Sequence, residues 1–232
     1  MMANYHIRVY KDEDYEMVRD LFKSGMEEHV RPLFEYIMKL PRTKVLLLGA
    51  FLGLYISFKS LLLSATTISA ILAFIWFASN YIFTSYIQAI LQEDLLDIQR
   101  YYLDKKGFGF WVAEAHGKVI GTVAALPYFN AAGGSKVELK RMYVKKEYRG
   151  QGLGKAFCRK LIYFARQEGY STIVLETSIV HYDAQRLYEN MGFKLDHMFV
   201  APSFIERLLH FLILHYRLDI PVTNGQFLQK YC

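Results

Sequence analysis

The sequence predicts an α/β (α+β) domain, with helices flanking a mixed central sheet and a hydrophobic, membrane-inserted helical hairpin after the first helix. Residues 137–165 predict the domain, because they combine a strand, a glycine-rich turn and a helical apolar stripe. The apolar run predicts the hairpin, because Lys59 is the only charged residue in the 39 residues from Val45 to Phe83. With 232 residues, the chain has room for one domain of about 150–190 residues and an extra segment.

The chain begins with a strand and a helix. Tyr5–Tyr10 is a short β-forming run, Asp12 is a candidate helix N-cap, and apolar residues follow it at helical spacing. We therefore expect residues 1–40 to form the N-terminal strand and helix of the domain, residues 41–84 the membrane-inserted segment, and residues 85–232 the main domain.

The apolar run is long enough to cross a bilayer. Leu61–Phe83 has 23 residues, and about 20 residues span roughly 30 Å of hydrocarbon. Val45–Phe58, with 14 residues, is short for a full crossing. A buried pair of core helices is the alternative, but the run is longer than soluble cores use. Both flanks belong to one predicted domain, so we expect two helices of roughly 18 residues with a turn near Phe58–Ser64.

The charges that flank the run favour one orientation. Lys39, Arg42 and Lys44 precede it, which favours a cytosolic domain. The other flank is acidic, so charge alone would also permit a single pass with the main domain in a lumen. Lys59 near the turn is long enough to reach the far headgroups.

Strands and helices alternate after the run. The apolar spacing and the turn residues predict each of them. We expect an amphipathic helix over 86–102, strands over 108–115, 119–126 and 137–144, a helix after residue 153, a strand over 171–177, a short helix over 183–191, and strands over 194–200 and 211–218.

The turn Arg149–Gly154 is suited to an anion. Its glycines allow a tight turn whose N–H groups face outward, and the following helix N-terminus adds donors and a positive dipole end. From Gly133 to Arg166 there are ten Lys or Arg residues against two acids. The net charge of +6 is concentrated here, which favours a polyphosphate cofactor over nucleic acid, since nucleic acid would need a broader basic face.

Two common phosphate motifs do not fit this turn. A Walker loop needs a hydroxyl after Gly154-Lys155, where the chain has Ala156, and a dinucleotide fingerprint has a different glycine spacing. No His, Cys and Asp cluster has metal spacing, so no metal is predicted. The two cysteines, Cys158 and Cys232, give no disulfide framework and favour a reducing compartment.

Two motifs together resemble the GNAT acyltransferase superfamily. The first is Arg149-x-x-Gly-x-Gly, and the second is Ala184-x₃-Tyr188-x₃-Gly192-Phe193 downstream of it. The resemblance implies acetyl-CoA as co-substrate, with its pyrophosphate on the turn, its pantetheine arm beside Ala184 and its carbonyl oxygen at the backbone near Val144. The implied cofactor-binding residues are Met142, Tyr143, Val144, Arg149, Gly150, Gln151, Gly152, Leu153, Gly154, Lys155 and Ala184. His181 departs from the pattern, since the family often has an asparagine there.

Acetyl transfer to an amine needs a base, donors for the oxyanion and an acid for the leaving thiolate. Tyr188 suits the acid, because a tyrosine pKa of about 10 is comparable to that of a thiol; the alternative is a tyrosine that only packs under the sheet. Glu138 matches the place where some GNAT enzymes have a glutamate base, and Glu176 is the second candidate. Either carboxylate could instead be a structural partner of Lys140 or Arg141.

The whole chain is similar to the vertebrate camello-type N-acetyltransferases. The apolar run follows the first helix, and the resemblance is carried by the sequence segments Leu40–Thr43, Phe110–Glu114 and Phe164–Tyr170. The family includes cysteine S-conjugate, aspartate and protein lysine acetyltransferases, and the resemblance implies an endoplasmic reticulum membrane enzyme with the lipid bilayer as partner. In GNAT domains the segment after the first helix helps to wall the acceptor site, and here that segment is the membrane insert, so we expect an amphipathic amine acceptor such as a cysteine S-conjugate. Protein lysine and aspartate are the alternative acceptors, and a non-enzymatic membrane adaptor is a further alternative. An aspartate site would need an arginine clamp, which the sequence does not locate.

Overall fold

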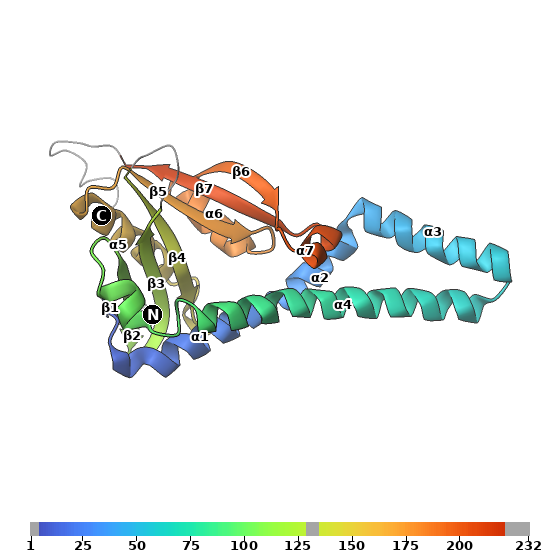
Figure 1. Cartoon of the computed structure of the whole chain (residues 1–232), viewed down its shortest axis with the longest axis horizontal. Helices are drawn as coiled ribbons and strands as arrows, with labels where there is room; N and C mark the ends of the chain where they lie inside the picture. Colours follow the sequence, from blue (N-terminus) through green and yellow to red (C-terminus); the bar gives the residue numbers. More distant parts are fainter. Residues whose placement is uncertain (1–4, 129–134, 221–232) are drawn as a thin grey trace.

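The computed structural model describes residues 5–128 and 135–220 of the chain, and within them a seven-stranded sheet has the order β1-β2-β3-β4-β5-β7-β6. Helices cover both of its faces (Figure 1). The strands are β1 (His6–Val9), β2 (Gly109–Ala115), β3 (Lys118–Pro127), β4 (Lys136–Val144), β5 (Thr172–Ser178), β6 (Lys194–Val200) and β7 (Leu212–Asp219). The α-helices are α1 (Tyr15–Glu27), α2 (Val30–Lys39), α3 (Pro41–Phe58), α4 (Leu61–Gln92), α5 (Leu153–Gln167), α6 (Tyr182–Asn190) and α7 (Phe204–Leu209).

The sheet is mixed, as predicted. β4 and β5 are parallel, from Lys136 beside Thr172 to Leu139 beside Leu175, and the other neighbouring strands are antiparallel. A parallel pair needs a crossover, and the helix α5 supplies it. This arrangement confirms the predicted fold class of a mixed sheet flanked by helices.

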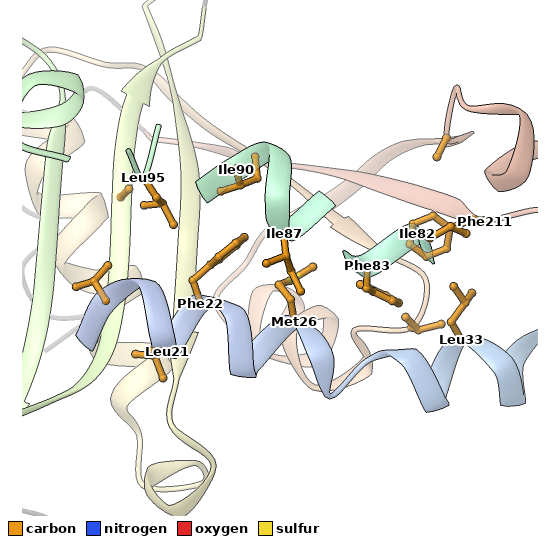
Figure 2. Close-up of a cluster of buried hydrophobic side chains, with 14 of the residues drawn as sticks. Leu21, Phe22, Met26, Leu33, Ile82, Phe83, Ile87, Ile90, Leu95 and Phe211 are labelled. Carbon is orange, nitrogen blue, oxygen red and sulfur yellow. The ribbon is translucent and has the colours of Figure 1, made fainter. Parts of the chain in front are cut away.

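Each face of the sheet has its own core. α5 and α6 pack on one face, which we call the cofactor face, with Phe157, Leu161 and Tyr188 among its buried side chains. The opposite face, which we call the anchor face, is covered by α1 and the second half of α4, and α2 packs against α4. In Figure 2, α1 and α4 meet through Phe22, Met26 and Ile87, among others. The two cores are therefore separated by the sheet itself.

α3 and α4 are joined at Lys59 and Ser60, inside the range where the sequence predicts a turn. Lys59 has φ 51°, and the Ser60 hydroxyl accepts a hydrogen bond from the N–H of Leu63 at 3.3 Å, which caps α4. Among the described residues, α4 is the one helix long and apolar enough to cross a membrane. Insertion of the α3–α4 pair in a bilayer stays a prediction.

α4 is longer than the sequence analysis expects. It has 32 residues, and it runs without a break through residue 84, where a domain boundary was expected. The prediction of a separate helix over 86–102 is wrong: its first turns belong to α4, and its end is the π-helical turn Gln99–Leu103. No glycine or proline lies between Phe83 and Gln92 to end the helix.

Candidate active site

A gap opens between β4 and β5 next to the point where the parallel ladder ends. The two strands pair as far as Leu139 and Leu175, but β4 continues to Val144 and β5 to Ser178 without pairing to each other. Over this stretch Met142 and Val144 pack on the cofactor-face core, and Tyr143 packs on the anchor-face core. The β5-side edge of β4 is therefore left open here, as an edge with which an extended ligand could pair.

The glycine turn leads from β4 into α5. Gly150 and Gly152 have φ 74° and 86°, in the left-handed region that favours glycine, and Gly152 caps α5. Gly154 serves a different purpose, because a Cβ there would lie 2.7 Å from Cδ2 of Leu187 on α6. Two glycines shape the turn, and the third lets α5 and α6 approach each other.

The other residues of the turn contribute in different ways. Leu153 is buried in the cofactor-face core, so it can offer a ligand only its backbone N–H. Lys155 is exposed on the first turn of α5, and Gln151 donates from Nε2 to the carbonyl of Glu147 at 3.0 Å. The backbone and the Lys155 ammonium are therefore the groups of α5 that can meet a phosphate.

Arg149 is held by two acceptors. Its Nε donates to the carbonyl of Val144 at 2.9 Å, and its Nη1 and Nη2 donate to the Glu28 carboxylate at 2.7 and 3.2 Å. Glu28 follows α1 directly, so the first helix reaches across to the turn. The carboxylate occupies the guanidinium edge that a phosphate would use.

Tyr188 projects from α6 into the cofactor-face core. Its ring lies beside those of Phe193 and Tyr216, and Ala184 precedes it by one turn of the helix. Within the described residues its hydroxyl makes no hydrogen bond. Burial raises the pKa of Tyr188, so the hydroxyl keeps its proton at neutral pH.

The N-cap of α6 contains the one departure from the family pattern. His181 lies with its ring centroid 4.0 Å from that of His29, and its Nδ1 is 3.1 Å from Oγ1 of Thr177. Among the described residues, Nε2 of His181 and Oγ of Ser178 are the two side-chain polar atoms that are completely shielded from solvent and make no hydrogen bond. Burial lowers the pKa of His181 to about 3 and that of His29 to about 4, so both rings are neutral.

Glu138 and Glu176 lie on the anchor face, on neighbouring strands. Glu138 is buried; burial raises its pKa, the Lys140 ammonium at 3.4 Å opposes that rise, and Glu176 adds to it. Glu176 is about half exposed and lies 3.7 Å from Nδ1 of His215 on β7. The structure brings the two carboxylates together and leaves Tyr188 on the other face of the sheet.

A buried ion pair that the sequence analysis missed joins β4 to the segment that follows α4. Arg141 donates from Nε and Nη2 to the Asp94 carboxylate at 2.8 and 3.0 Å, and from Nη1 to the Tyr86 hydroxyl at 2.9 Å. Tyr102 also donates to Asp94. Arg141 has φ 52°, at an irregularity in the β3–β4 pairing. No local pattern could reveal this pair, because its members are far apart in the sequence.

Within residues 5–128 and 135–220, no three His, Cys, Asp or Glu side chains are grouped so that they could hold a metal ion.

Comparisons with known proteins agree with this geometry. Residues 74–193 match the model of the acetyltransferase (GNAT) family. An acetyltransferase of the GNAT family from Staphylococcus aureus Mu50 has the same fold, with a TM-score of 0.55 at 19% identity, over 93% of this chain and 98% of that one. The chain is therefore a GNAT acetyltransferase.

Its relatives give the narrower family. N-acetyltransferase 8 of Rattus norvegicus is 42% identical over 194 residues, which cover 83% of this chain and 87% of the relative. N-acetyltransferase 8B of Rattus norvegicus is 40% identical over 218 residues, 93% of this chain and 98% of the relative. The protein belongs to the N-acetyltransferase 8 family.

Proposed function

We propose that this protein transfers the acetyl group of acetyl-CoA to the amine of a cysteine S-conjugate at the endoplasmic reticulum membrane, with its domain on the cytosolic side. One observation carries the proposal: α4 covers the anchor face, where both candidate bases lie, and continues outward as an exposed apolar helix. An acceptor that approaches this face would come from the surface of a bilayer. GNAT acetyltransferases use acetyl-CoA, and the cofactor face offers the groups that it needs.

The cofactor would lie along the turn and the gap. Its pyrophosphate would accept hydrogen bonds from the N–H groups at the start of α5 and would pair with the positive charges of Arg149 and Lys155. It would displace the Glu28 carboxylate from Arg149. The pantetheine arm would extend past Ala184 and pair with the open edge of β4. Backbone N–H groups at Met142–Val144 would then donate hydrogen bonds to the thioester oxygen.

The chemistry would use both faces of the sheet. Glu138, with Glu176 as second candidate, would take a proton from the acceptor ammonium, and the free amine would attack the thioester carbonyl. The C–S bond then breaks, Tyr188 protonates the CoA thiolate, and the second proton lost by the new amide nitrogen returns Tyr188 to its neutral form, while the carboxyl releases its proton to solvent. The raised pKa of Glu138 makes its carboxylate a stronger base. Burial raises the pKa of Tyr188, which keeps the hydroxyl protonated in the free protein but makes it a weaker acid toward the thiolate.

A cysteine with an apolar S-substituent suits this location better than free aspartate. An aspartate acceptor would need a cation for its extra carboxylate, and the nearest arginine of β4, Arg141, is already paired with Asp94. An amphipathic acceptor concentrates at the bilayer surface instead. Lysine side chains of membrane or secretory proteins are the second candidate, because they too can be presented at the membrane.

The structure supports a domain on one side of the membrane. β1 pairs with β2, and the Arg8 guanidinium donates to Glu114 at 2.7 Å, so residues before and after the apolar helices form one sheet. If α3 and α4 insert, they must enter and return on the same side. Lys39, Arg42 and Lys44 then favour the cytosol.

The test is CoA release by detergent-solubilised protein supplied with acetyl-CoA and, in parallel, S-benzyl-cysteine, aspartate or a lysine peptide. We expect turnover on S-benzyl-cysteine, abolished in Arg149→Glu because that change removes the cofactor's counter-charge. Turnover on the peptide alone would move the protein to the lysine-acetylating class. Acetyl-CoA binding without turnover on any of the three would contradict the proposed acceptors.

A further inference from the structure

The helix α7, in the connection between β6 and β7, has two apolar sides. Ile205 and Leu209 pack into the anchor-face core beside Phe211. Phe204 and Leu208, one turn apart, are 79% and 50% exposed. A helix on a water-facing surface normally has a single apolar stripe that faces the core. The outward stripe of Phe204 and Leu208 is therefore unexplained by the fold.

α7 lies at the point where α3 leaves the domain. Arg42, in the first turn of α3, donates from Nη2 to the carbonyl of Leu208 at 3.4 Å, and α7 also packs against α4. Figure 1 shows α7 between the start of β7 and the point where α3 leaves the domain. The outward apolar stripe is thus next to the exposed apolar helices.

Helix length gives the depth of this point in a bilayer. α3 has 18 residues, which at 1.5 Å per residue is about 27 Å, close to the roughly 30 Å of a hydrocarbon core. If the turn at Lys59 reaches the far headgroups, the root of α3 lies at the near boundary. The basic side chains of Arg42 and Lys44 are at that level, as expected beside headgroups.

Aromatic residues of α4 lie at the same depth. Counting the same length from the turn reaches the region of Ala78, and the neighbouring Trp76, Phe77 and Tyr81 are 43%, 69% and 58% exposed. Trp and Tyr concentrate at membrane–water interfaces. The lengths of α3 and α4 therefore both put the near boundary of the hydrocarbon core at the level of α7.

We propose that α7 is a third membrane contact, in which Phe204 and Leu208 insert into the headgroup–hydrocarbon boundary while Arg42 and the exposed Arg207 face anionic headgroups. This inference rests on the proposed insertion of α3 and α4. This third contact would fix the tilt of the domain relative to the bilayer, because the two inserted helices alone leave the domain free to tilt about the point where they leave it. The β6–β7 connection would then border the membrane, and an amphipathic acceptor could reach the anchor face without crossing bulk water.

Site-specific fluorescence in vesicles tests the contact. The full chain, with Cys232→Ser and with Cys158 left in the core, receives one cysteine at a time through Phe204→Cys, Leu208→Cys, Leu62→Cys or Tyr163→Cys. Each variant is labelled with an environment-sensitive dye and reconstituted in phosphatidylcholine–phosphatidylserine vesicles. Tyr163, 57% exposed on α5, is the matched control, and Leu62, 75% exposed beside the turn, reports insertion of the helices.

We expect dyes at 204 and 208 to be quenched at least twofold more by shallow spin-labelled lipid than the dye at 163, and to be shielded from iodide. The dye at 62 should be quenched by lipid as well. If 62 is quenched by lipid but 204 and 208 behave like 163, α7 is not a membrane contact, although the helices insert. If 62 is itself open to iodide, the membrane attachment fails and this inference fails with it.

Discussion

The two faces of the sheet differ in how their sites are built. On the cofactor face, the turn, α5 and α6 lie close together in the sequence, and each group is positioned by its own local motif. On the anchor face, α1, the second half of α4 and β4 come from distant parts of the chain, and Arg141 connects β4 to Tyr86 of α4 and to Asp94 just after it. The proposed cofactor site therefore depends on local structure, whereas the proposed acceptor side depends on the position of α4.

Breaking the Arg141–Asp94 pair should have the largest effect. Asp94→Asn leaves a buried guanidinium without a counter-charge, since the two side chains are 8% and 3% exposed. We expect a loss of about 3–5 kcal/mol in the free energy of unfolding, measured by denaturant titration. Glu35→Gln, which breaks the exposed pair with Arg31, should cost less than about 0.5 kcal/mol. Equal losses in the two variants would contradict the proposed role of the buried pair.

Tyr188→Phe tests the cofactor face. We expect kcat to fall by about 10²-fold or more while the unfolding midpoint stays nearly constant, because the hydroxyl makes no hydrogen bond among the described residues. Tyr216→Phe is the control on the same face. It removes a hydrogen bond to Glu189 of 2.9 Å, so it should lower stability by about 1 kcal/mol and leave kcat unchanged. A kcat that is unchanged in Tyr188→Phe would remove the tyrosine from the acid role.

The pH profile separates the two carboxylates of the anchor face. The pKa of Glu138 is raised, so this group takes up its proton above the usual glutamate pKa of about 4.3. A base works only without its proton, so kcat/KM should fall as pH falls through that raised pKa. Glu138→Gln should lower kcat/KM by about 10²-fold at neutral pH. It should also remove the fall of kcat/KM at low pH. If Glu176→Gln does so instead, the second candidate is the base.

Glu28→Gln should have the smallest effect, and in the favourable direction. The carboxylate holds the Arg149 guanidinium in the free protein, so its removal frees the guanidinium for phosphate. Because the ion pair is partly exposed, we expect the KM for acetyl-CoA to fall only about two- to fivefold. Glu27→Gln, at the preceding position, serves as the control. A higher KM in Glu28→Gln would mean that Glu28 positions Arg149 instead of competing for it.

The local motifs could be predicted from the sequence, and the long-range contacts could not. The glycine turn, Tyr188 on its helix and the strands around them follow from residue spacing and turn chemistry, and the predicted turn range near Phe58–Ser64 contains Lys59 and Ser60. Ser203 and Glu206 form the capping box that opens α7, and their spacing is a local pattern of the same kind.

The missed features depend on tertiary packing. The continuation of α4 to Gln92 is stabilised by its contact with α1, which the apolar composition could not distinguish from contact with lipid. The sequence pattern assigns Gly154 only to the turn, but the structure requires a glycine there because a Cβ would collide with Leu187 on another helix. The contacts of Glu28 with Arg149 and of His29 with His181 likewise join residues more than a hundred positions apart.

The continuity of α4 also affects the order of events during synthesis. Arg8 of β1 pairs with Val112 of β2, so the first strand leaves the ribosome well before its partner and waits while both apolar helices emerge. The anchor-face core cannot be completed without α4, and the part of α4 that enters this core is contiguous with the exposed part. A nascent chain that loses this helix would not yield a free catalytic domain; it would lack one wall of its core and become a substrate for quality control.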